Sequence, residues 1–171
     1  KKDDAIIMPS INFISSYRVA ELLNLKIYLA DVDPLSGQMT PSSVESCIKK
    51  NKIKKIKVIV TMYLGGYIEN HLEFFKLKKK YKCFLVEDAC HALGAKYKFN
   101  NSYYSLGSCR HSDIAVFSFH PVKNITTGEG GAILTNNRML AKRIALFRNH
   151  GMVKNKNYWK YDIKDLGFNY R

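Results

Sequence analysis

The sequence lacks a long hydrophobic run: no apolar stretch approaches the roughly 20 residues that a membrane-spanning helix needs. The short apolar stretch after the charged residues 1–4 is also shorter than the apolar core of a secretory signal peptide. The four cysteines form no Cys-x-x-Cys pair, so we interpret them as reduced thiols of a cytoplasmic protein. Internal repeats and low-complexity linkers are also absent, which favours a single folded unit.

Acidic residues are scarce: Asp and Glu number 14 against 28 Lys and Arg, which gives a formal charge of +14. A basic surface attracts nucleic acid, acidic membranes or phosphorylated small molecules. The lysine runs at 49–57 and 76–82 lack the interleaved aromatic residues and glycine-rich arms of a nucleic-acid reader. We therefore interpret them as a solvated, lysine-rich surface, and we predict neither a nucleic-acid partner nor a membrane partner.

What the sequence does contain is a regular alternation of apolar strand patterns and helical patterns, in a composition that is 46% hydrophobic. The predicted strands cover 26–31, 58–62, 83–87, 114–119 and 131–134, and the predicted helices cover 14–23, 41–50, 68–81 and 138–149. Strands that are continuously apolar are buried on both faces. The sequence therefore predicts an α/β fold with a mostly parallel sheet covered by helices. Ligands of such folds bind beyond the carboxyl ends of the strands.

Two residues at predicted strand ends bear reactive groups. Asp88 follows the third strand directly, and Lys123 follows the fourth strand by a few residues. A buried carboxylate needs a cationic partner or hydrogen bonds, and a partly desolvated amine becomes a nucleophile towards carbonyls. Taken singly, Asp88 also fits a cap of a turn or helix, and Lys123 also fits a solvated loop lysine.

Together the two residues indicate pyridoxal phosphate (PLP) chemistry. This cofactor needs a lysine for its Schiff base and a carboxylate against its pyridine nitrogen. The carboxylate keeps the nitrogen protonated, so that the ring absorbs electrons when a substrate C–H bond breaks. The released lysine then carries the proton between carbons. The glycine-rich segment 126–131 precedes a strand rather than a helix, so we interpret it as shaping the lysine loop and not as a phosphate loop.

The sequence resembles the DegT/DnrJ/EryC1/StrS family of PLP-dependent sugar aminotransferases in four segments. These are 87–95 (EDACHALGA), 117–132 (FSFHPVKNITTGEGGA), 148–151 (RNHG) and 166–171 (LGFNYR). The run SFHPVK followed by ITTGEGG is most similar to the branch that makes 4-amino-4,6-dideoxy sugars on UDP for pseudaminic-acid-type pathways. The resemblance spans nearly the whole chain and implies part of the large domain of a fold-type-I PLP transferase, working as a homodimer.

The resemblance also implies roles for individual residues. Lys123 matches the Schiff-base lysine, and Asp88 matches the carboxylate on the pyridine nitrogen. The remaining matches are His91 near the ring's 3-hydroxyl, Ser118 at the phosphate, Asn169 at the phosphate of the neighbouring subunit's cofactor, and Phe13 stacked on the ring. The segment around Phe13 departs from the family's Thr-Phe-x-Ala-Thr pattern. His91, Ser118 and Phe13 also fit ordinary packed residues.

Parts of the family's pattern are missing from the chain. These are the upstream Gly-Thr/Ser segment of the phosphate cup, the small C-terminal domain that follows Asn-Tyr-Arg, and the frequent His before the glycine in 62–65. Residues 1–171 are therefore expected to form a partial PLP-binding large domain. We expect this piece alone to bind PLP poorly and to be inactive.

The activity implied by the resemblance is transfer of an amino group from glutamate to a 4-keto-6-deoxy nucleotide sugar, UDP-linked, in the biosynthesis of amino sugars for cell-surface glycans. Dehydratase relatives carry histidine in place of the lysine, so Lys123 favours transamination. A basic module that binds nucleic acid with steep salt dependence, or that regulates a partner, is the non-enzymatic alternative. A metal site from Asp88, His91 and His120 has suitable ligand types but no familiar spacing, and we predict no metal.

Overall fold

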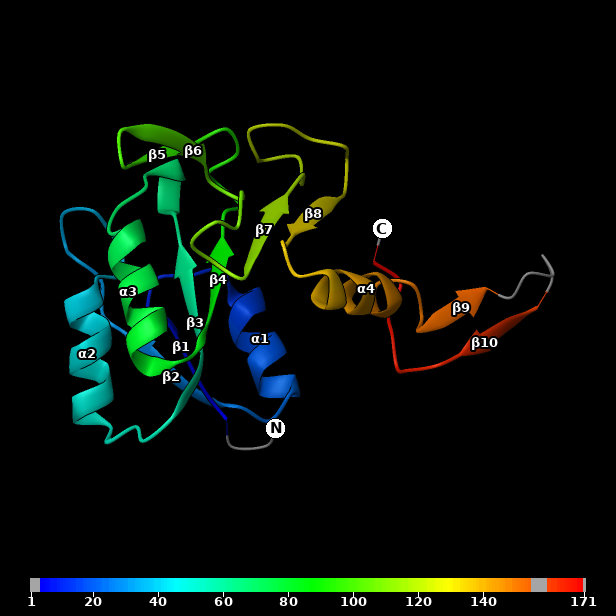
Figure 1. The fold of residues 1–171 in the computed structure, drawn as a ribbon, viewed down its shortest axis with the longest axis horizontal. Helices are drawn as coiled ribbons and strands as arrows, with labels where there is room; N and C mark the ends of the chain where they lie inside the picture. The colour runs from blue at the N-terminus through cyan, green and yellow to red at the C-terminus, as the bar shows by residue number, and fades with distance from the viewer. Residues whose placement is uncertain (1–3, 155–159, 171) are drawn as a thin grey trace.

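The computed structural model describes residues 4–154 and 160–170, and a six-stranded sheet forms its centre (Figure 1). The strand order across the sheet is β2 (Lys26–Ala30), β1 (Ala5–Pro9), β3 (Ile56–Met62), β4 (Phe84–Asp88), β7 (Ile114–Ser118) and β8 (Gly131–Leu134). Neighbouring strands are parallel except β7 and β8, which are antiparallel. The predicted α/β fold with a mostly parallel sheet is confirmed.

Helices α2 (Pro41–Lys50) and α3 (His71–Tyr81) cover one face of the sheet (Figure 1). The core beneath them joins Ile7, Ile59 and Leu85, which have no exposed surface, to Val44 of α2 and Phe74 of α3. Apolar burial of this kind supplies most of the stability of an α/β layer. The periodic apolar faces of these helices are therefore what fixes them on the sheet.

Helix α1 (Ile14–Leu22) covers the opposite face of the sheet. There Ala20 packs against Ile6 and Met8 of β1 and Val60 of β3, with Val86 of β4 beside them. Side chains alternate between the two faces along a strand. In β4 this alternation directs Leu85 and Glu87 towards α2 and α3. Val86 and Asp88 point to the α1 side.

The start of α2 is built as the sequence suggests, with a polar cap in front of a proline. The Thr40 hydroxyl accepts a hydrogen bond from the Ser43 N–H at 3.1 Å, and the Ser43 hydroxyl accepts one from the Thr40 N–H at 3.1 Å. This reciprocal pair satisfies two donors at the helix start, and Pro41 has no N–H to leave unsatisfied.

Replacing Thr40 by alanine is expected to lower the free energy of unfolding by about 1 kcal/mol, because the first turn of α2 loses its cap. Ser46 is an exposed residue farther along the same helix, and Ser46→Ala is the matched control, expected to change stability little. Urea unfolding of the two variants measures the difference. Equal midpoints would contradict the capping role.

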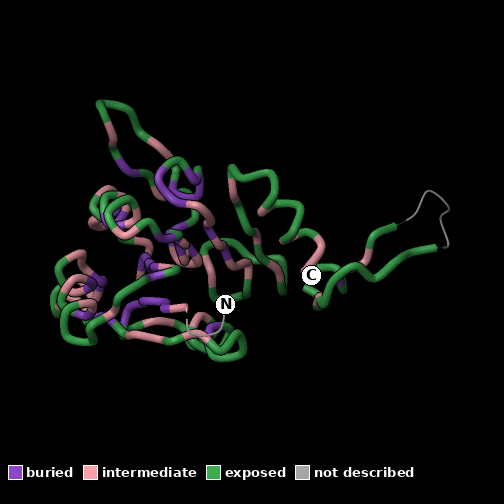
Figure 2. The backbone as a smooth tube through the Cα atoms, turned by 60° about the horizontal axis from the view of Figure 1, so that its bottom comes forward, coloured by how far each residue is buried: buried purple, intermediate pink, exposed green. Residues whose placement is uncertain are grey.

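The chain also forms elements outside the main sheet. Among the described residues these are the one-turn 3₁₀ helix η1 (Leu64–Gly66), the hairpin β5 (Lys96–Phe99) and β6 (Ser102–Ser105), α4 (Arg138–Phe147), and the hairpin β9 (Met152–Lys154) and β10 (Tyr161–Ile163). Figure 2 shows that buried residues concentrate in the sheet and in the helices packed on it. The segment from β8 onward is mostly exposed, and α4 has no fully buried residue.

The predicted helices and strands are present in the predicted order, but β1, η1 and the hairpins β5–β6 and β9–β10 were not predicted. Strand β1 is an inner strand of the sheet, between β2 and β3, with all five residues buried. The helix predicted from residue 68 begins at His71, because Asn70 has a left-handed backbone with φ of 55° and 67–70 remain a loop. The four cysteines are free thiols, three of them buried, as predicted.

Candidate functional site

The carboxyl ends of three neighbouring parallel strands meet at one edge of the sheet. In the strand register Met62 pairs with Asp88, and Asp88 pairs with Val116. Asp88 is the last residue of β4, and Ser118 is the last residue of β7. The lysine loop leaves β7 from this same edge, so the fold places the sequence-predicted acid and amine at one rim.

Asp88 is half-buried and accepts hydrogen bonds from the segment that follows it and from the segment after β3. Its Oδ1 accepts a hydrogen bond from the Cys90 N–H at 3.2 Å, and its carbonyl accepts one from the Tyr63 N–H at 3.2 Å. It follows Val86 by two residues, so its side chain belongs to the α1 side of β4. The carboxylate therefore has a defined direction at the rim rather than the freedom of an exposed turn residue.

Lys123 lies in a loop, 119–130, whose two ends are hydrogen-bonded together. The Phe119 N–H donates to the Gly130 carbonyl at 2.9 Å, and the Thr127 N–H donates to the Phe119 carbonyl at 3.0 Å. The Lys123 N–H donates to the His120 carbonyl at 2.9 Å, which forms a tight turn just before the lysine. Lys123 is half-buried, whereas most lysines of the chain are exposed.

The pKa of the Cys90 thiol is affected by both Asp88 and Lys123. Burial raises the pKa of Cys90 to about 12, with a further increase from its hydrogen bond with Asp88 and from the Asp88 charge, while the Lys123 charge opposes the increase. Cys90 therefore lies within electrostatic range of the carboxylate and the amine together. The sequence alone indicates only a reduced thiol at Cys90 and does not predict that both charges act on it.

His91 and Ser118 also lie at this edge. The His91 Nδ1 accepts a hydrogen bond from the Gly65 N–H at 3.3 Å, which joins it to the loop after β3. The neighbouring Gly66 has φ of 82°, and a Cβ there would lie 2.7 Å from the His91 carbonyl oxygen, so the approach of the two loops requires glycine. The Ser118 hydroxyl accepts a hydrogen bond from the His120 N–H at 3.3 Å.

Phe13 and Asn169 take different positions. Phe13 is the residue before α1, on the same side of the sheet as Asp88, and its side chain is 66% exposed. Asn169 is exposed and forms an isolated antiparallel bridge with Asn149 beside the end of α4 (Figure 1). The fold thus gathers Asp88, Cys90 and the lysine loop, and leaves Asn169 on a separate segment.

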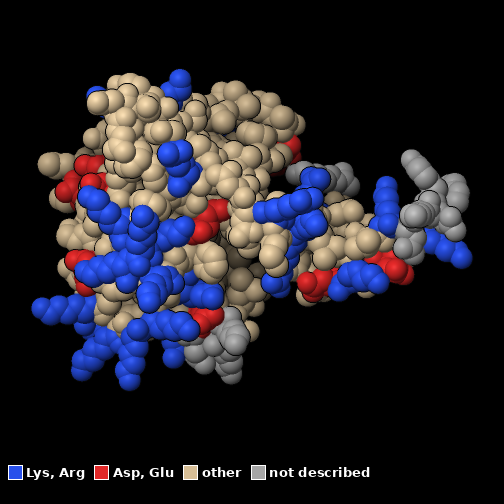
Figure 3. Space-filling model, viewed as in Figure 1, with Lys and Arg blue, Asp and Glu red and all other residues tan. Residues whose placement is uncertain are grey.

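The lysine-rich segments gather on a different part of the molecule (Figure 3). They follow the C-terminal ends of α2 and α3 and the connection into β3, and their exposed members are Lys49, Lys50, Lys52, Lys54, Lys55, Lys57, Lys76, Lys79, Lys80 and Lys82. Helices that return from parallel strands end at the amino edge of the sheet, so this basic surface lies away from the Asp88 rim. Lysines at helix C-termini also offset the helix dipole.

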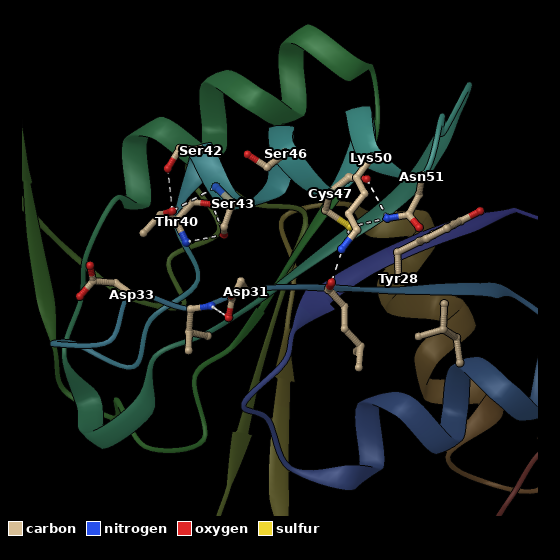
Figure 4. Close-up of a pocket in the computed structure, with 13 residues that line it drawn as sticks. Tyr28, Asp31, Asp33, Thr40, Ser42, Ser43, Ser46, Cys47, Lys50 and Asn51 are labelled. Atoms are coloured by element: carbon tan, nitrogen blue, oxygen red, sulfur yellow. Dashed lines mark hydrogen bonds between the residues drawn. The ribbon is translucent and has the colours of Figure 1, made fainter.

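A groove of about 820 Å³ lies between the edge strand β2 and α2 and contains none of the six residues predicted for the site (Figure 4). Its polar lining is supplied by Tyr28, Asp31, Asp33, Thr40, Ser42, Ser43, Ser46, Lys50 and Asn51. This groove is therefore separate from the residues at the Asp88 rim.

The described residues, 4–154 and 160–170, contain neither a metal-binding cluster nor a membrane-spanning helix. No group of three or more His, Cys, Asp or Glu residues is arranged to hold a metal ion, so Asp88, His91 and His120 do not form the ligand set considered as an alternative. In this part of the chain no helix has the length and apolar character needed to cross a membrane.

The sheet and the helices packed on it have the fold of solved aminotransferases. The chain belongs to the DegT/DnrJ/EryC1/StrS aminotransferase family, which matches residues 1–171. The family and fold inferred from the motifs around Asp88 and Lys123 are thereby confirmed.

Among curated relatives, a UDP-4-amino-4,6-dideoxy-N-acetyl-beta-L-altrosamine transaminase of Campylobacter jejuni is 36% identical over 170 residues, which are 99% of this chain and 43% of the relative. A GDP-perosamine synthase of Caulobacter vibrioides is 34% identical, covering 98% of this chain and 42% of the relative. The chain thus spans less than half the length of these relatives.

Solved structures give the same picture. Helicobacter pylori PseC, an aminotransferase involved in the biosynthesis of pseudoaminic acid, superposes with a TM-score of 0.85 at 30% identity, over 99% of this chain and 43% of that one. Spr1654 of Streptococcus pneumoniae, solved in a PLP-form, superposes with a TM-score of 0.80 at 25% identity, over 98% of this chain and 45% of that one.

Proposed function

We propose that the chain is the cofactor-holding part of an enzyme that moves an amino group from glutamate to C4 of a UDP-linked 4-keto-6-deoxy sugar. The observation that supports the proposal is that Asp88 ends β4 and the Lys123 loop leaves the neighbouring β7 at the same edge of a parallel sheet, with both charges acting on the Cys90 thiol. The transaminase of C. jejuni supports the UDP-sugar assignment. A nucleotide sugar and an amino acid are thus the proposed small-molecule partners.

The residues at the rim fit PLP by their chemistry. A half-buried carboxylate and a half-buried amine are the two groups that the pyridine nitrogen and the aldehyde require. When bound, PLP supplies the electron sink for breaking the C–H bond beside the amino group. In the chain itself, Asp88 keeps a proton on the ring nitrogen and Lys123 holds the cofactor and carries the substrate proton. Ser118 binds phosphate, Phe13 stacks on the ring, and His91 lies near the 3-hydroxyl.

The same proposal covers the setting of the enzyme. Asn169 lies on a segment apart from Asp88, which suits contact with the cofactor of a second subunit in a homodimer. Four free thiols suit a cytoplasmic enzyme. Retention of Lys123 favours transamination over dehydration. Residues 1–171 form a partial large domain, which alone binds PLP weakly and does not turn over the amino donor. Turnover of the amino donor by the purified 171-residue chain would contradict the proposed inactivity.

The activity is tested by joining the chain to the flanking segments of the C. jejuni transaminase in place of its 170 aligned residues. With PLP and glutamate, this chimera is expected to aminate a UDP-linked 4-keto-6-deoxy sugar, and mass spectrometry measures the amino sugar and 2-oxoglutarate. Asp88→Asn is expected to lower the rate by about a hundredfold or more, because the amide has no charge to keep the ring nitrogen protonated.

Circular dichroism and thermal unfolding first establish that the chimera and its Asp88→Asn variant are folded. A folded chimera without glutamate-dependent transfer, beside an active parent enzyme, would contradict the proposed activity. Full activity in the Asp88→Asn variant would contradict the role of that carboxylate. A preference for a GDP-linked sugar would contradict only the choice of nucleotide.

A further inference from the structure

Glu87, the residue before Asp88, is a carboxyl group buried in the core. Its side chain is 2% exposed and lies on the α3 side of β4, opposite Asp88. One oxygen, Oε2, accepts a hydrogen bond from the Gly107 N–H at 3.2 Å, and the other, Oε1, lies 3.7 Å from the His71 Nδ1. A carboxyl buried in the core is costly, and neither the motif resemblance nor the proposed chemistry assigns Glu87 a role.

Tyr63 and His71 connect this carboxyl back to Asp88. The Tyr63 hydroxyl lies 2.7 Å from the His71 Nδ1, a hydrogen bond buried in the core, while the Tyr63 N–H donates to the Asp88 carbonyl at 3.2 Å. The contacts therefore form a circuit of two hydrogen bonds, Tyr63 to Asp88 and Tyr63 to His71, and one close contact of 3.7 Å, His71 to Glu87. It runs from Asp88 through Tyr63 and His71 to Glu87, which is joined to Asp88 by the peptide bond.

A second layer of rings encloses the circuit. The Tyr97 ring centroid lies 4.0 Å from that of His71, and the Tyr97 hydroxyl is hydrogen-bonded to the His111 Nδ1 at 2.7 Å. The groups come from the end of β3, the start of α3, β4, β5 and the connection before β7. Five parts of the chain are thus fixed relative to one another directly behind the strand end that presents Asp88.

We propose that Glu87, acting through His71 and Tyr63, is a positioning residue that holds the end of β4 so that Asp88 faces the lysine loop. Because Glu87 and Asp88 project to opposite faces of one strand, anchoring the first limits rotation of the second. The inference rests on the proposed function only in the meaning given to Asp88, since the geometry of the circuit needs no cofactor. The His71 Nε2 has no hydrogen-bond partner among the described residues, so the circuit restrains Asp88 through the two hydrogen bonds and the one close contact that it makes.

Hydrogen exchange of two amides measures the position of Asp88 directly in the chain without cofactor. The Tyr63 N–H is protected by the Asp88 carbonyl, and the Cys90 N–H is protected by the Asp88 carboxylate. In Glu87→Ala, protection of both amides is expected to fall by about tenfold or more relative to the Ile7 amide in β1, because a buried hydrogen-bonding partner is lost. Glu87→Gln keeps an oxygen for Gly107 and is expected to restore protection.

Two further variants separate positioning from general stability. Leu85→Val weakens packing on the same strand and the same face without changing the circuit. It is therefore expected to lower the exchange protection of the Tyr63, Cys90 and Ile7 amides to a similar extent. Tyr63→Phe breaks the circuit with a minimal change of shape, so it is expected to reproduce the selective loss even if Glu87→Ala does not fold. Equal loss at the Tyr63, Cys90 and Ile7 amides in the circuit variants would overturn the proposal, whatever the outcome of the transamination assay.

Discussion

Borohydride treatment of the chain in the presence of PLP is expected to attach the cofactor to Lys123 in preference to the other lysines, and Lys123→Ala is expected to lose this site of attachment completely. Surface lysines react with an aldehyde at the rate set by its bulk concentration. A lysine beside groups that hold the ring and phosphate reacts at a much higher effective concentration. Borohydride makes each event permanent, so even weak binding by the 171-residue chain accumulates a site-specific product.

Peptide mapping by mass spectrometry measures the fraction modified at each lysine. Lys96 is an exposed lysine on β5, and Lys96→Ala is the matched control that should leave the modification of Lys123 unchanged. Asp88→Asn is expected to reduce the preference for Lys123 by removing the partner of the ring nitrogen. Modification spread evenly over the lysines of the unaltered chain would show that the rim does not hold the cofactor.

Much of the fold could be predicted because burial leaves a direct trace in sequence. The strand at 58–62 is apolar except for Thr61, and the structure places its inner residues between helices on both faces. Strand β1 carries the same signal in five residues, AIIMP. The charged residues before this run and the proline that ends it obscure the strand pattern. Its inner place in the sheet, between β2 and β3, depends on topology, which no local pattern encodes.

The hairpin β5–β6 was also missed, although its turn carries a usable signal. Asn100 and Asn101 both have positive φ, 45° and 61°, the backbone that a two-residue hairpin turn of the mirror-image type requires. Asparagine adopts this region more readily than most residues. The flanking residues KYKF alternate polar and aromatic side chains, and SYYS is also rich in tyrosine, so the Asn-Asn pair between them favours a hairpin.

For the candidate site, Asp88 and Lys123 were selected because both follow strand ends and because PLP chemistry pairs an acid with an amine. The residues behind the site could not be found in this way. Tyr63, His71 and Glu87 are scattered through the sequence, and each alone resembles an ordinary loop, helix or strand residue. Their grouping arises only when β3, α3 and β4 are packed, and a single sequence contains no measure of that proximity.

The largest stability effect is expected from exchanging single members of the buried pair His71 and Glu87. Burial raises the pKa of Glu87 from 4.5 to about 7, so in this range the folded chain keeps a proton that the unfolded chain has lost. The free energy of unfolding therefore falls as pH rises. Burial lowers the pKa of His71 from 6.5 to about 4, with a smaller contribution from His111, so the unfolded chain holds the extra proton. This contribution rises with pH.

Between pH 4.5 and 6.5 the two contributions cancel. The unfolded chain carries one proton on His71, and the folded chain carries one proton on Glu87, so folding moves a proton without changing its number. The surroundings support the neutral imidazole, because the His71 Nε2 is buried with no hydrogen-bond partner among the described residues, and a charged ring there would leave an N–H unsatisfied. Burial also raises the pKa of Tyr63, which keeps its hydroxyl protonated.

Replacing one member of the pair is expected to reveal the pH dependence of the free energy of unfolding that the two residues cancel in the unaltered chain. Relative to the unaltered chain, the free energy of unfolding of Glu87→Gln should rise between pH 4.5 and 7 by an amount on the order of 3 kcal/mol, and that of His71→Gln should fall by a similar amount between pH 4 and 6.5. Urea unfolding across pH 4–8 measures both differences, and other titrating groups cancel because the three chains share them. Parallel curves for all three chains would mean that the pair does not hold one proton in the folded state.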